Sequence, residues 1–157
     1  MLVPAIPQIP AHVVGADLIG SWSLESYTDT AEGAGAELPF GVNPIGLLIY
    51  TPDGFMSAQL MSLSRSPLRA NDLNAKTESD SQQKSDAFIG YSGEYFFDEV
   101  TATVSHTPSV SFVPALIGQR LQRQVKLDGD RLTLTVTTPQ IRGNSIKSSL
   151  CWLKLHR

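Results

Sequence analysis

His106 is a candidate proton-transfer residue because it sits among apolar neighbours. In a β-strand, Ala102 and Val104 would share its face. If that face points inward, burial lowers the pKa of the imidazole and keeps the ring neutral at pH 7. A neutral imidazole can act as a general base. The alternative is a core histidine that bonds to its neighbours and has no chemical role.

Arg123 is a candidate anion-binding residue for a similar reason. In a β-strand it would share a face with Leu121 and Val125, so an inward face would carry a guanidinium among apolar side chains. Because an unpaired buried charge is destabilising, such an arginine needs a partner or a polar ligand. It could hold a carboxylate or an enolate through two parallel hydrogen bonds. The alternative is a surface or barrel-end arginine, with Arg120 turned inward after a slip of one residue.

Three tyrosines, Tyr50, Tyr91 and Tyr95, are candidate hydrogen-bond donors. A buried phenol can stabilise negative charge that develops on a carbonyl oxygen. Tyr91 and Tyr95 would share one face of a strand, and Gly93 between them leaves space for a bulge or for a ligand. The ordinary alternative is an amphipathic tyrosine in a strand wall.

Together these residues predict a site for a small apolar molecule. Ser57 and Gln59 would add hydrogen bonds from another strand, and Leu134 would add apolar wall. The predicted catalytic residues are His106, Tyr95 and Arg123. The predicted ligand-binding residues are Tyr50, Tyr91, Ser57, Gln59, Leu121 and Leu134. We expect no metal, because the three histidines are dispersed, and no cofactor, because nothing resembles a nucleotide-binding loop.

The elements that would position these residues are strands separated by turn signals. In Thr51-Pro-Asp-Gly54, proline presets φ and glycine supplies a positive φ, and Asp128-Gly-Asp130 is a hairpin signal. Eight strands are expected, at residues 17–27, 45–51, 55–63, 91–97, 101–107, 118–127, 131–138 and 145–155. Loops are expected at residues 29–39 and 108–114. A short helix would begin at Ser79 or Ser81 and run to about Ile89, where Gly90 would end it.

Strands of this number and length can close into a barrel. Gly20-Ser-Trp22 favours closure, because a tryptophan at the start of the first strand can plug one end. We therefore predict an all-β fold, an eight-stranded antiparallel barrel that admits one small ligand, with the short helix between the third and fourth strands. A two-sheet sandwich is the alternative. Residues 16–157 would form this domain, behind a tail (residues 1–15) that is either strapped across a barrel mouth or disordered.

Charge and composition exclude some classes of partner. The net charge is −3 and the 12 lysines and arginines form no basic stripe, so we expect no nucleic acid partner. No apolar run is long enough to span a membrane. The single cysteine, Cys151, fits a reducing compartment, and we expect a cytoplasmic protein. Leu153 and Leu155 on an outward face could support a homodimer.

Several short segments resemble one known family. In their order and spacing, Leu18–Leu24, Pro39–Gly41, Gly46–Tyr50, Asp53–Leu60, Tyr91–Tyr95, Val104–His106, Gly118–Arg123 and Gly129–Leu134 are similar to the lipocalin-like proteins of bacteria and fungi, a branch of the calycin barrels. The resemblance implies that a basic side chain near Trp152, here Lys154, covers Trp22. It also implies a small-molecule pocket, because some fungal members act as cofactor-free cyclases or isomerases in natural-product pathways.

Three functions remain open at this point. We favour a cofactor-independent cyclase or isomerase that acts on an apolar, polyketide- or terpenoid-like intermediate of secondary metabolism. The alternative is a carrier that binds a hydrophobic metabolite and releases it unchanged. A barrel filled by its own side chains, with a role in protein interaction, is the third possibility.

Overall fold

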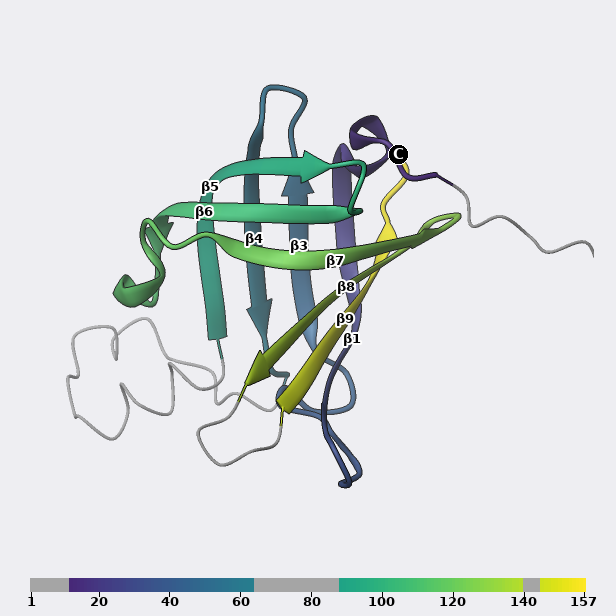
Figure 1. The fold of residues 1–157 in the computed structure, drawn as a ribbon, viewed down its shortest axis with the longest axis vertical. Helices are drawn as coiled ribbons and strands as arrows, with labels where there is room; N and C mark the ends of the chain where they lie inside the picture. The colour runs from purple at the N-terminus through teal and green to yellow at the C-terminus, as the bar shows by residue number, and fades with distance from the viewer. Residues whose placement is uncertain (1–11, 64–87, 140–144) are drawn as a thin grey trace, which may run out of the picture.

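The protein is a closed β-barrel in a computed structural model that describes residues 12–63, 88–139 and 145–157. Neighbouring strands pair in the order β2-β1-β3-β4-β5-β6-β7-β8-β9, and a further pairing of β1 with β9 closes the sheet (Figure 1). All pairings are antiparallel. Eight strands form the barrel and β2 is an added edge strand, so the predicted all-β barrel is confirmed and the sandwich is not adopted.

The strands alternate buried and exposed side chains, as the sequence pattern requires. On β4, for example, Met56, Ala58 and Leu60 are buried. The strands are β1 Gly20–Ala31, β2 Ala36–Glu37, β3 Ile45–Tyr50, β4 Phe55–Met61, β5 Phe88–Asp98, β6 Thr103–Ser111, β7 Leu121–Asp128, β8 Arg131–Pro139 and β9 Ser145–Lys154. Within the described residues, two short 3₁₀ helices are also present, η1 Gly15–Leu18 and η3 Pro114–Leu116. Among the described residues, no helix is long and apolar enough to cross a membrane.

One end of the barrel is closed around Trp22. The indole N–H donates to the carbonyl oxygen of Leu18 at 2.9 Å. The Lys154 ammonium lies 4.5 Å from the centre of the Trp22 ring and donates to the carbonyl oxygen of Ile19. Gly20 fits beneath this lysine with φ of +130°, a conformation that favours glycine. The arrangement that the resemblance implied for Trp22 and Lys154 is therefore confirmed.

Among the predicted loops and helix, three segments differ from the structure. The predicted loop at residues 29–39 is wrong in part, because β1 continues to Ala31 and pairs with β2. The predicted loop at residues 108–114 is wrong in part, because β6 continues to Ser111 through pairing with β5. The predicted helix lies mostly outside the described residues, but its expected end at Ile89 is wrong. Phe88 and Ile89 are already in β5 and pair with β4. In each case ladder hydrogen bonds outweigh the local loop or cap signal.

Of the predicted tail at residues 1–15, residues 1–11 lie outside the described part of the chain. The backbone N–H of Gly15 donates to the side chain of Glu99 at 3.0 Å. The boundary between tail and domain stays a prediction.

Candidate functional site

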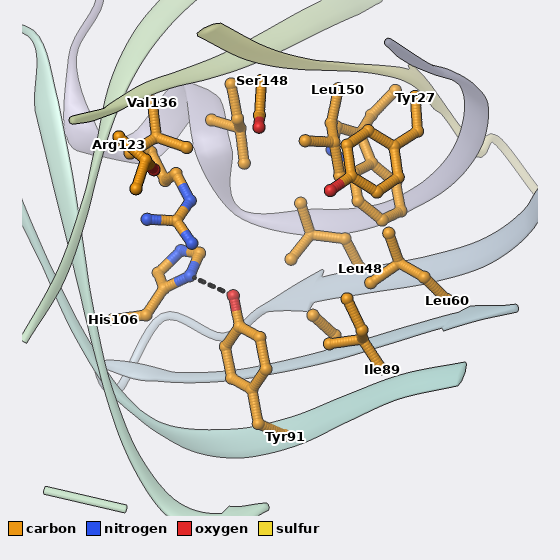
Figure 2. Close-up of a pocket in the computed structure, with 14 residues that line it drawn as sticks. Tyr27, Leu48, Leu60, Ile89, Tyr91, His106, Arg123, Val136, Ser148 and Leu150 are labelled. Carbon is orange, nitrogen blue, oxygen red and sulfur yellow. Dashed lines mark hydrogen bonds between the residues drawn. The ribbon is translucent and has the colours of Figure 1, made fainter. Parts of the chain in front are cut away.

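The barrel contains a cavity of about 240 Å³. His106, Arg123 and the hydroxyl of Tyr91 meet at one end of it, as Figure 2 shows. The apolar lining consists of Leu48, Ala58, Leu60, Ile89, Leu134, Val136 and Leu150. Apolar walls with a few convergent polar groups are typical of small-molecule sites.

His106, on β6, is held between two tyrosines. The Tyr50 hydroxyl at the end of β3 lies 2.7 Å from Nε2, and the Tyr91 hydroxyl on β5 lies 2.9 Å from Nδ1. The imidazole is only 1% exposed. Burial, and secondly the charge of Arg123, lower the pKa of His106 to about 3. The ring is therefore neutral at pH 7.

The surroundings of Tyr50 determine the direction of these hydrogen bonds. A neutral imidazole donates through one nitrogen and accepts through the other. Tyr50 is 1% exposed, and within the described residues its hydroxyl has no acceptor other than His106. The Tyr50 O–H therefore donates to Nε2, because it would otherwise be buried without an acceptor. Nδ1–H then donates to Tyr91, which leaves the Tyr91 O–H to donate into the cavity.

Arg123 places a second donor beside His106 (Figure 2). One guanidinium nitrogen donates to the carbonyl oxygen of Gln122 at 2.9 Å. No carboxylate in the described part of the chain lies within 4.0 Å of this guanidinium. Tyr91 and Arg123, which we call the donor pair, both present hydrogens to the cavity. This end of the cavity therefore suits an oxygen acceptor or an anion.

The fold agrees with the comparison of the sequence with known protein families. Residues 19–155 match the lipocalin-like domain family, a range that contains all eight strands of the closed barrel. The chain belongs to this family. A lipocalin-like barrel suits the binding of a small hydrophobic molecule. Neither the curated proteins nor the solved structures gave a significant match.

Four of the predicted site residues line the cavity of this lipocalin-like barrel. They are His106, Arg123, Tyr91 and Leu134. A fifth, Tyr50, is packed behind the imidazole and contacts it directly. The register that would turn Arg120 inward is not adopted. The roles of these five predicted residues in binding or catalysis stay predictions.

Tyr95 and Leu121 lie outside the cavity lining. The Tyr95 hydroxyl donates to the carbonyl oxygen of Thr51 at 2.8 Å, beside the turn that joins β3 to β4. Its ring packs on the ring of Tyr50, with centroids 4.7 Å apart. Leu121 packs against the core and lines an adjoining gap beside β7. Tyr95 therefore supports Tyr50 and does not face a ligand in this cavity.

Ser57 and Gln59 lie on the outer face of β4, so their predicted contact with a ligand inside the barrel is wrong. The inner face is filled by Met56, Ala58 and Leu60, and Gln59 is exposed. The Ser57 hydroxyl bonds to the Ser92 hydroxyl at 2.8 Å. Larger apolar side chains take the inward face, because burying them is more favourable than burying an amide and a hydroxyl.

Sequence reasoning missed Tyr27, which lines the cavity from β1. Strict alternation from Trp22 and Leu24 would place Tyr27 outside. The register against β9 shifts between Leu24 and Ser26, and this bulge reverses the alternation. No local glycine or proline marks the bulge in the sequence.

Trp152, also in the lining, was expected only to belong to the closure around Trp22. Its indole N–H is buried and has no acceptor among the described residues. An unpaired buried donor is destabilising unless a ligand or water satisfies it. Among the described residues, Trp152 thus leaves one buried donor of the lining without a partner.

Proposed function

We propose that this lipocalin-like barrel is a cofactor-independent isomerase or cyclase for a small apolar carbonyl compound. The observation that carries the proposal is the donor pair: two hydrogen-bond donors converge at one end of an apolar cavity that has no carboxylate in its described lining. Donors held in a dry site stabilise negative charge that develops on a substrate oxygen. The apolar walls would select one reactive conformer of the substrate.

In this proposal Tyr91 and Arg123 bond the carbonyl oxygen. Negative charge gathers on that oxygen as an enolate forms or as a ring closes within the substrate. Any proton released at carbon leaves to water, since both nitrogens of His106 are already engaged by tyrosines. His106 is therefore a positioning residue that orients the Tyr91 O–H, in place of the direct base expected from the sequence.

A non-catalytic carrier is the second candidate, and two observations favour it. The low pKa of His106 makes the imidazole a weak base, and no carboxylate lines the described cavity. A carrier would use the donor pair only to orient an oxygenated guest. The biosynthetic role, the cytoplasmic location and a homodimer stay predictions.

Exchange of carbon-bound hydrogen separates the two candidates. With 2-methyl-1-tetralone in D₂O, we expect the protein to accelerate deuterium incorporation at the carbon next to the carbonyl, measured by mass spectrometry. Tyr91→Phe removes one donor and is expected to slow this exchange about 100-fold, the usual effect of losing an oxyanion donor. Tyr95→Phe is the matched control, because its hydroxyl bonds to Thr51 outside the cavity, and its rate should equal that of the parent protein.

Binding of the ketone is measured in the same samples. A ketone that binds without any accelerated exchange would identify a carrier. Equal rates for Tyr91→Phe and the parent protein would contradict the role of the donor pair. A ketone that does not bind at all would remove the proposal altogether.

A further inference from the structure

The barrel wall is open between two of its strands. β7 and β8 pair from Asp128↔Arg131 only as far as Gln124↔Thr135. Beyond that point, residues 121–123 of β7 pair with β6 alone, and residues 136–139 of β8 pair with β9 alone. Figure 1 shows the two strands diverging toward the end of β8. We call the opening between residues 121–123 and 136–139 the side gap.

A second cavity, of about 800 Å³, occupies the side gap. It is lined by every residue from 120 to 124 and from 135 to 138, together with Thr103. Consecutive strand residues point to opposite faces of a sheet. Both sets line this space because the edges of β7 and β8 face it without pairing across it. Arg123, Val136 and Thr138 line both this cavity and the inner one, so the two adjoin at these side chains.

The chemistry of the side gap favours an anion. Arg120 and Arg123 both line it, and none of its described lining residues is acidic. Arg120 donates from Nε to the Ser105 hydroxyl at 3.1 Å, which holds the side chain beside β6 while it contributes to the lining of the gap. Neither arginine has a carboxylate within 4.0 Å in the described residues. Gln122, Gln124 and several threonines complete a polar lining.

We propose that the ligand is an amphiphile: its apolar body lies in the inner cavity and a carboxylate head lies in the side gap, bound by Arg120. This inference rests on the proposed function, and it extends the substrate class to an apolar carbonyl compound with an acidic head group. Arg123 stands where body and head meet, so it bonds the inner oxygen while Arg120 bonds the head. An open wall at this point lets the charged head keep contact with water, which avoids the penalty for burying a carboxylate.

Binding of two matched probes tests this placement. Decanoate and decan-1-ol share an apolar chain and differ in the charge of the head group. By calorimetric titration at low salt, we expect Arg120→Gln to weaken decanoate binding about five- to tenfold, the loss of one charge-assisted hydrogen bond in a partly exposed site. Decan-1-ol binding should not change. Arg131→Gln is the control for net charge, because Arg131 lies away from the gap and pairs with Glu25 at 3.0 Å, and it should alter neither probe.

Each other outcome has a definite meaning. If both probes bind and Arg120→Gln weakens neither or both equally, the carboxylate is not in the side gap and the inference is wrong, whereas the proposed function stands. If neither probe binds, the inference is wrong, and the proposed function is decided by the binding of the ketone. Thermal unfolding of each variant verifies that the fold is intact. Added salt should reduce the decanoate effect and leave decan-1-ol unaffected, since exposed charges are screened.

Discussion

The contribution of His106 to the free energy of unfolding should fall by about 1.4 kcal/mol for each unit by which the pH is lowered from 6.5 to 4. The pKa of His106 is about 3 in the folded protein and is expected near 6.5 in the unfolded chain. Between these values the unfolded state binds a proton that the folded state does not. Stability contributed by the neutral imidazole is therefore fully present above pH 6.5 and is lost as the pH falls toward 3.

Urea unfolding at several pH values measures this slope. In His106→Gln the slope should largely disappear over the same range, although the variant is less stable at neutral pH because one tyrosine loses its partner. His156→Gln is the matched control, since His156 is on the surface and pairs with Asp130. It should retain the slope. An equal slope in the parent protein and in His106→Gln would show that the imidazole is not held neutral by burial.

Gly93→Ala should destabilise the barrel by about 3 kcal/mol, the upper part of the usual range for overpacking. Gly93, on β5, lies opposite Pro108 of β6 at a bulge in which Ser92 already pairs with Val110. A Cβ at this position would collide with the carbonyl oxygen of Thr107 and would lie 2.9 Å from the Cα of Pro108. Both are backbone atoms, which cannot move without breaking the ladder.

The control for this substitution is Gly35→Ala. Gly35 lies between β1 and β2, and a Cβ there meets nothing within 4 Å. Both substitutions reduce the entropy of the unfolded chain equally. Gly35→Ala should thus change stability by less than about 0.5 kcal/mol, as surface substitutions usually do. Urea unfolding compares the two variants, and equal stabilities would contradict the close packing at the bulge.

Most of the barrel could be predicted from alternation and turn chemistry. Turn signals such as Thr51-Pro-Asp-Gly54 place the strand ends closely, because proline and glycine act through local geometry. Strand extensions were not predictable, since Ala31 and Ser111 continue their strands through pairing with distant residues. The bulge that brings Tyr27 into the cavity has no local signal for the same reason.

The candidate site could be predicted only where one face of a strand is clearly more apolar. That holds for Val104 with His106, and for Val125 with Arg123. On β4 the same rule places Met56, Ala58 and Leu60 inside, as in the structure, so the assignment of Ser57 and Gln59 to the cavity wall went against the pattern. The pairing of Tyr50 and Tyr91 through His106 depends on three strands of the closed sheet, so spacing along the chain could not reveal it.

The tautomer of His106 tests most directly whether Tyr91 is aimed into the cavity as a donor. Long-range ¹H–¹⁵N correlation spectra distinguish a protonated ring nitrogen from an unprotonated one, and they follow both nitrogens as the pH changes. We predict a proton on Nδ1, none on Nε2, and no change between pH 7 and about pH 4, given the low pKa of the ring. A proton on Nε2, or titration near pH 6.5, would contradict this arrangement.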